Sequence, residues 1–135
     1  MDVRKFAVEE TGVLELRGAN DEPLIGEDGK PMTITGFGPG SKTYAQAQAE
    51  NQNRMIDKLK RKGKTEQSAA DKARELAEFL AACTREFSAN IEYDGLQGEA
   101  LFKAVYSDAS IGFIAEQFAK WLNDWSSFRT ASTTS

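Results

Sequence analysis

The tripeptide Gly38-Pro39-Gly40 divides the chain into two parts with different hydrophobic periods. Before it, residues 32–37 alternate apolar residues with Thr or Gly, as a half-buried β-strand does. After it, Ser41 is a good helix N-cap, and apolar residues then recur at helical spacing along the rest of the chain. Two glycines around a proline permit no regular element at this point. This order predicts an α+β fold, in which a small N-terminal β hairpin or meander precedes about four α-helices.

The predicted β unit covers residues 12–37 and contains two turns. Residues 19–23 form the first turn, because Asn and Asp bond to their own backbone and Pro fixes φ. Residues 27–31 form the second turn, where Gly29 can take a positive φ. A three-stranded meander and a hairpin plus one strand both fit this spacing. Residues 1–11 are expected to form a flexible arm.

The helical part is predicted over residues 41–128 of a single domain, with a disordered polar tail at 129–135. Its first helix, residues 42–62, is thin in apolar residues, so it needs a partner or oligomerisation to stabilise it. A stripe of small and apolar residues predicts a second helix from Ala69 to Phe87. Two further helices are predicted, at residues 99–106 and from Ile111 to Trp125.

Charge is distributed unevenly along the chain, although its net value is only −4. Residues 41–75 hold 9 basic and 5 acidic residues, whereas residues 1–40 and 76–135 each hold 4 basic and 8 acidic ones. A basic middle between acidic ends indicates self-complementary packing or an interaction face. The basic run from Lys58 to Lys64 is a solvated surface, a contact for an acidic protein or a nucleic-acid patch. No aromatic residue interleaves it, which argues against nucleic acid.

The chain lacks the residues on which most catalytic and metal sites depend. It has no His and one Cys, which excludes a structural zinc site within one chain and removes the commonest general base. Cys83 lies on an apolar helical stripe, where cysteine behaves as a small hydrophobe. We therefore expect no enzyme activity, no cofactor and no metal. A lone cysteine and the absence of a long apolar run favour a reducing compartment and no membrane partner.

Two sets of residues are candidates for binding a partner. Arg54, Lys58 and Lys62 share one face of the first predicted helix, so they form a coherent basic patch. The second set is aromatic and consists of Phe113, Trp121, Trp125 and Phe128. Aromatic residues dominate protein cores and are also enriched in binding hot spots, so both interpretations of the second set stay open.

The strand, the helix entry and the C-terminal half resemble tail assembly chaperones of long-tailed bacteriophages. The likeness covers roughly residues 24–128 and includes a Ser-x-x-Tyr motif, which adds Tyr44 to the candidate contacts. The segments that carry it are Met32-Thr33-Ile34-Thr35, Gly38-Pro39-Gly40-Ser41-Lys42-Thr43-Tyr44, Leu101-Phe102-Lys103-Ala104-Val105-Tyr106, Ile111-Gly112-Phe113-Ile114-Ala115-Glu116-Gln117 and Trp125-Ser126-Ser127-Phe128.

The resemblance implies a protein that binds the tape measure protein, engages the major tail protein and helps the tail tube polymerise in the host cytoplasm. Such chaperones are generally absent from the mature virion. The expected partners are these proteins, without nucleic acid or membrane, and a homo-oligomer is a further expectation. Two alternatives stay open: a structural virion component, such as a minor tail or head–tail connector protein, and a nucleic-acid-binding or host-takeover protein that uses the basic run.

Overall fold

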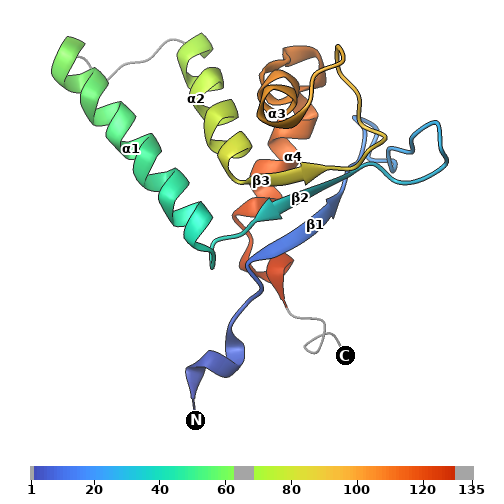
Figure 1. The fold of residues 1–135 in the computed structure, drawn as a ribbon, viewed down its shortest axis with the longest axis horizontal. Helices are drawn as coiled ribbons and strands as arrows, with labels where there is room; N and C mark the ends of the chain where they lie inside the picture. Colours follow the sequence, from blue (N-terminus) through green and yellow to red (C-terminus); the bar gives the residue numbers. More distant parts are fainter. Residues whose placement is uncertain (1, 63–68, 130–135) are drawn as a thin grey trace.

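The computed structural model describes residues 2–62 and 69–129, without the side chains at positions 58, 59, 61 and 62. Within these residues there are three strands and four helices, so the fold is α+β as the sequence predicts (Figure 1). In chain order they are β1 (Thr11–Glu15), β2 (Thr33–Phe37), α1 (Lys42–Lys62), α2 (Ala69–Ala82), β3 (Thr84–Phe87), α3 (Gly98–Ser107) and α4 (Gly112–Leu122). Short 3-10 turns lie at η1 (Val3–Phe6), η2 (Ala109–Ile111) and η3 (Trp125–Phe128).

The strands form one antiparallel sheet in the order β1-β2-β3. Both turns predicted between β1 and β2 are present, with Asp21 at a φ of 64° and Gly29 at a φ of 77°. Each turn closes on an isolated bridge, Arg17 with Pro23 and Ile25 with Pro31. The segment between the two turns therefore makes single β-bridge pairs and does not form a further strand between β1 and β2.

The third strand comes from outside the predicted β unit. The apolar pattern predicts one helix from Ala69 to Phe87, and this prediction is wrong, because α2 ends at Ala82 and residues 84–87 form β3. Cys83 is where the chain leaves the helix, since its carbonyl accepts a hydrogen bond of 2.7 Å from the N–H of Phe37 in β2. Pairing with β2 thus takes over the backbone groups that another helical turn would have used.

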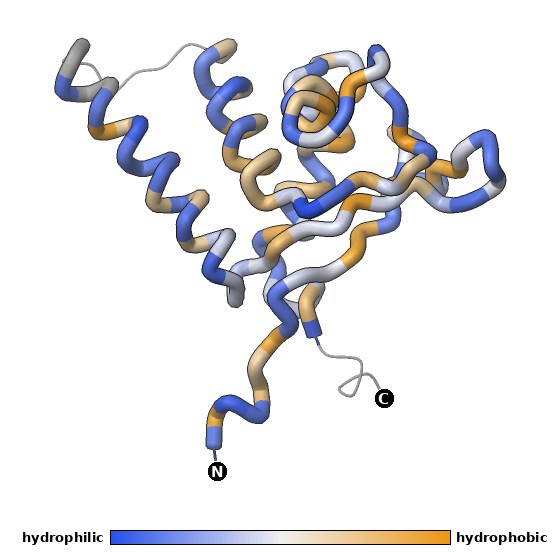
Figure 2. The backbone as a smooth tube through the Cα atoms, in the orientation of Figure 1, coloured by the Kyte–Doolittle hydropathy of each residue, from blue (hydrophilic) through white to orange (hydrophobic). Residues whose placement is uncertain are grey.

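Helices α2, α3 and α4 pack against the sheet, and the face that carries Ile34 and Gly36 is buried (Figure 1). Phe118 of α4 covers this face so closely that a Cβ atom at Gly36 would lie 2.8 Å from its ring. A row of rings continues from there, with centroids 5.5 Å apart for Tyr106 and Phe118 and 4.6 Å apart for Trp121 and Phe128. Figure 2 shows the same contrast in hydropathy, with apolar stretches along the strands and a mostly hydrophilic α1.

The two ends of the chain differ from the predicted boundaries. Residues 2–8 form an arm that leaves β1 and points away from the sheet (Figure 1), but Thr11 already belongs to β1. The last helix ends at Leu122 rather than Trp125, because η3 begins a separate turn. Apart from Arg129, the tail predicted at residues 129–135 lies outside the described residues.

Candidate partner-binding cleft between α1 and α2

The start of α1 is held firmly by its cap. The Ser41 hydroxyl accepts a hydrogen bond from the N–H of Tyr44 at 3.1 Å and donates one to the carbonyl of Gly38 at 2.7 Å. Gly38 in turn lies against the Phe128 ring, where a Cβ atom would be only 2.6 Å away. The predicted N-cap is therefore confirmed, and it ties the first turn of α1 to the core.

The first half of α1 packs against α2 and also reaches Asn123, the residue that follows α4. Tyr44 and Ala47 are buried, and the Tyr44 ring meets the Phe79 ring of α2 edge to face, with centroids 5.6 Å apart. The Tyr44 hydroxyl also donates a hydrogen bond to Asn123 Oδ1 at 2.8 Å, just beyond the end of α4. These contacts hold the N-terminal end of α1 against the C-terminal end of α2.

Beyond Tyr44 and Ala47 the two helices diverge (Figure 1), and residues of both helices line a cleft between them. The cleft has a volume of about 210 Å³ and is lined by Asn51, Lys72, Glu75, Leu76 and Phe79. Two apolar side chains here are left in water: Leu76, which lines the cleft, is 43% exposed, and Met55, one helical turn after Asn51, is 44% exposed. Groups of this kind, exposed together and flanked by polar residues, mark a binding surface.

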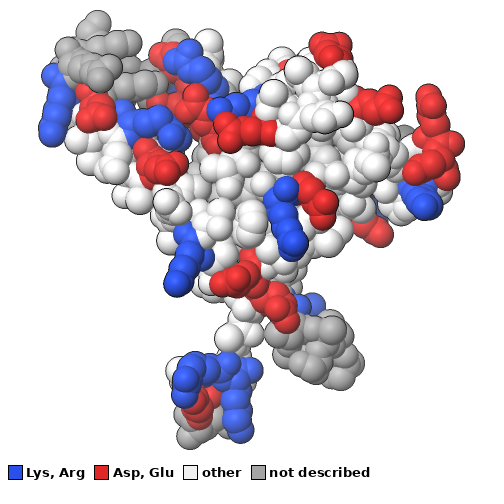
Figure 3. Space-filling view, in the orientation of Figure 1, with Lys and Arg blue, Asp and Glu red and all other residues white. Residues whose placement is uncertain are grey.

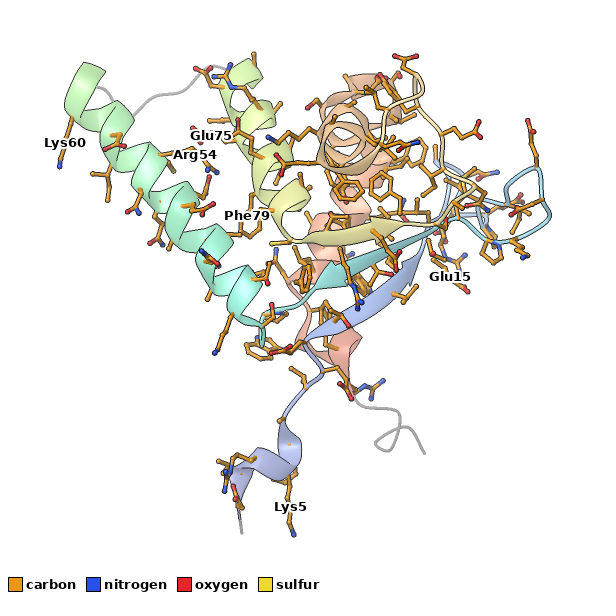
Figure 4. The ribbon with its side chains drawn as sticks, in the orientation of Figure 1. Lys5, Glu15, Arg54, Lys60, Glu75 and Phe79 are labelled. Carbon is orange, nitrogen blue, oxygen red and sulfur yellow. The ribbon has the colours of Figure 1, made fainter. Side chains whose placement is uncertain are left out.

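Polar groups inside the cleft are incompletely satisfied. Arg54 Nε lies 3.4 Å from Glu78 Oε2, which makes an ion pair but not a hydrogen bond of good geometry. Asn51 Oδ1 is also buried without a hydrogen-bond partner in the described part of the chain. Figure 4 shows that Arg54, Glu75 and Phe79 lie in the space between the helices, whereas Lys60 points away from α2. An acceptor for Arg54 and a donor for Asn51 are what a partner could supply here.

Charged side chains surround this region of the surface. Figure 3 shows Lys, Arg, Asp and Glu gathered at the outer ends of α1 and α2, while the neighbouring surface is largely uncharged. Arg74 pairs with Asp71 at 2.7 Å within α2, which leaves the Arg74 side chain still well exposed. The cleft therefore combines apolar and polar lining residues with a rim of mixed charge.

The structure does not bring the two predicted sets of contact residues together. Arg54 lies in the cleft, while the side chains of Lys58 and Lys62 lie outside the described residues. Tyr44 and Phe128 are buried in the core, and they support the fold rather than present a contact surface.

The other aromatic candidates lie on or after α4, away from the cleft. Trp121 is half-buried and packs its ring against Phe118, with centroids 5.8 Å apart. Phe113 is half-buried beside a shallow depression that Arg17 and Gln117 also line. Trp125 is 57% exposed, so it is the member of the aromatic set that remains available to a partner.

Sequence reasoning missed Phe79, which forms the wall of the cleft on α2. The signal for it was its position three residues after Leu76, a spacing that places two side chains next to each other on a helix. Glu75 was also missed, since a carboxylate gives no apolar signal although this one is buried.

Two ionisable groups of the described core, Cys83 and Tyr106, have pKa values raised by burial. Burial raises the pKa of the Cys83 thiol to about 12, so the nucleophilic thiolate is scarce at neutral pH. Burial also raises the pKa of Tyr106, whose hydroxyl shares a hydrogen bond of 2.7 Å with Thr84 Oγ1. Within residues 2–62 and 69–129 no group of His, Cys, Asp and Glu side chains is arranged to hold a metal ion. None of the helices described there has both the length and the hydropathy of a membrane span.

Comparison of the chain with protein-family models, with curated proteins and with solved structures finds no match. The cleft, the exposed apolar side chains and the sequence motifs are therefore the features that bear on function.

Proposed function

We propose that this protein is a tail assembly chaperone of a long-tailed bacteriophage. In this proposal it binds the tape measure protein in the host cytoplasm, recruits the major tail protein while the tube polymerises, and is absent from the mature virion. The observation that carries the proposal is the cleft between α1 and α2. The exposed Leu76 lines it together with Asn51, whose Oδ1 has no hydrogen-bond partner in the described part of the chain, and the exposed Met55 lies one helical turn after Asn51.

The cleft suits a helical partner. Two helices that touch at one end and diverge at the other leave room for a third helix, whose apolar stripe can cover the exposed side chains of both. The partner that the family resemblance implies is a long helical protein with apolar stripes, which aggregates when these stripes face water. Binding in the cleft would also stabilise the outer half of α1, where none of the described side chains from Asn51 onward is buried.

Co-expression with the tape measure protein encoded nearby tests the proposal. The wild-type chain is expected to keep that protein in the soluble fraction, and Leu76→Gln combined with Met55→Gln is expected to lose most of this effect. Ile25→Gln is the matched control, because Ile25 is exposed to a similar degree but lies between the turns of the β unit. A tape measure protein that stays equally insoluble with and without the wild-type chain would refute the chaperone function.

Analysis of purified phage particles distinguishes the chaperone function from the main alternative, a structural component of the virion. A chaperone is expected to be missing from them, so abundant protein in washed particles would make this chain a structural component such as a minor tail or connector protein. The nucleic-acid alternative predicts binding that weakens steeply as salt rises, in contrast to binding through an apolar cleft.

A further inference from the structure

The N-terminal arm contains a folded turn, η1, and the rest of the described chain does not cover the apolar side chains of this turn. Its one 3-10 turn is closed locally, since Asp2 Oδ1 accepts a hydrogen bond from the N–H of Arg4 at 2.9 Å and the Asp2 carboxylate pairs with the Arg4 guanidinium. Val3 and Phe6 are nevertheless 78% and 70% exposed, and no residue of η1 is buried. An exposed Phe beside an exposed Val on a preformed turn is typical of a segment that is buried on association.

The base of the arm is anchored, so the direction of the arm is set by the fold. The N–H of Glu9 donates a hydrogen bond of 2.7 Å to the carbonyl of Phe128, whose side chain is in the core. The Val8 side chain lies against Gly40, where a Cβ atom would be 2.9 Å from it. From this anchor the preceding residues project away from the body (Figure 1).

A groove at the opposite edge of the sheet offers an apolar surface that could cover the arm's exposed side chains. It has a volume of about 650 Å³ and lies along β3, which pairs only with β2 in the described part of the chain. Its apolar lining includes Phe87, Leu96 and Phe102, and Leu96 is among the exposed large hydrophobic residues. An aromatic side chain such as that of Phe6 fits a groove of this size and chemistry.

The charges of the two elements are complementary. The arm, residues 2–8, contains two basic residues, Arg4 and Lys5, and one acidic residue, Asp2, so its net charge is +1. The groove is lined by Glu86 and Glu92 as well as Arg85, so its net charge is −1. Opposite charges at the edge of an apolar contact favour the correct pairing of the two surfaces.

The topology indicates that the groove is filled by the arm of another molecule. The arm starts at β1, the groove lies beyond β3, and these strands are the two opposite edges of the sheet. The arm also points away from its own body (Figure 1). We propose that the chain self-associates by inserting the arm of one copy, with Phe6 as its anchor, into the β3 groove of a second copy. This contact uses no residue of the α1–α2 cleft, so it stands or falls independently of the chaperone function.

Sedimentation of the full chain and its variants tests the proposal. The wild type is expected to associate as its concentration rises, and Phe6→Ser or Leu96→Ser is expected to weaken the association at least about tenfold. Ile56→Ser is the matched control, because it also removes an exposed aliphatic side chain, but on α1, and it should leave the association unchanged. Folding of each variant is checked by circular dichroism, and Phe6 makes no buried contact whose loss could unfold the chain.

Mixing the two disruptive variants gives a result that only this arrangement predicts. A Phe6→Ser chain keeps an intact groove and a Leu96→Ser chain keeps an intact arm, so the mixture recovers association that neither variant shows alone. A photoreactive benzophenone residue at position 6 should crosslink to residues 85–102 of a differently labelled chain.

The proposal is overturned by any of three results. One is a wild-type chain that stays monomeric up to about 1 mM. Another is a mixture of the two variants that associates no better than either variant alone. The third is a crosslink from position 6 to its own chain, or to the α1–α2 cleft of another.

Discussion

Replacing Gly38 with Ala tests whether the helix entry and the C-terminal turn are packed as tightly as the structure places them. A Cβ atom at this position would lie 2.6 Å from Cγ and Cδ1 and 2.7 Å from Cδ2 of Phe128. Carbon atoms in contact normally stay about 3.5–4.0 Å apart, so one of the two groups must move by roughly 1 Å. Phe128 has little freedom to do so, because its ring packs against Trp121 and its carbonyl holds Glu9.

The expected cost is near the upper end for overpacking, about 3 kcal/mol. For a chain of 135 residues the unfolding entropy is about 0.28 kcal/mol/K, so the midpoint of thermal unfolding should fall by about 10 °C. Gly112→Ala is the control, because nothing lies within 4 Å of a Cβ atom there and the backbone is helical. Alanine at that position should stabilise the protein by about 0.5 kcal/mol, or about 2 °C.

Urea titration followed by tryptophan fluorescence is a suitable assay, since Trp121 lies against the Phe128 ring. The slope of the free energy against urea should stay the same in both variants, because the surface exposed on unfolding does not change. Gly38→Ala combined with Phe128→Leu should recover part of the loss, which identifies the Phe128 ring as the group that the new methyl meets. A Gly38→Ala variant with wild-type stability would refute this packing.

Three further predictions concern single groups of the core and the surface. Cys83, fully buried and with a pKa raised to about 12 by burial, should react with thiol reagents only after unfolding, and rapid labelling of the native protein would contradict this. Tyr44→Phe should lower the free energy of unfolding by about 1 kcal/mol through loss of the hydrogen bond to Asn123, whereas an unchanged urea midpoint would mean that this bond contributes nothing. Hydrogen bonds from Ser110 and Tyr93 lower the pKa of Asp108, so its contribution to stability is present at neutral pH and is lost as the pH falls through that lowered pKa. Asp108→Asn should therefore lower the melting temperature at pH 7 and converge with the wild type well below pH 3.9, the usual pKa of Asp, while a difference that persists in strong acid would exclude this linkage.

The two proposed binding surfaces share one physical origin. Both Phe6 and the group around Met55 and Leu76 are apolar side chains on elements that the core does not cover. The arm that carries Phe6 projects from the edge of the sheet (Figure 1), and Leu76 lines the cleft between the two diverging helices. One surface can therefore serve self-association while the other stays available to a different partner.

The sequence by itself determined most of the local structure. Ser41 caps α1 as predicted, and Gly29 takes the positive φ that its turn requires. Asp94 and Gly95 also have positive φ values, of 51° and 69°, as an Asp-Gly turn favours. Helix caps and turns depend on the few residues around them, so the sequence of one segment is sufficient to predict them.

Only the tertiary structure decided the rest. Residues 84–87 carry on the apolar stripe of α2, and they become a strand because β2 offers an unpaired edge that no local pattern reveals. Likewise Trp125 and Phe128 are three residues apart in one short turn, yet Phe128 is buried and Trp125 is exposed. Burial depends on which distant surfaces meet, here Gly12 and Gly38 against the Phe128 ring, and periodicity within one segment cannot specify such contacts.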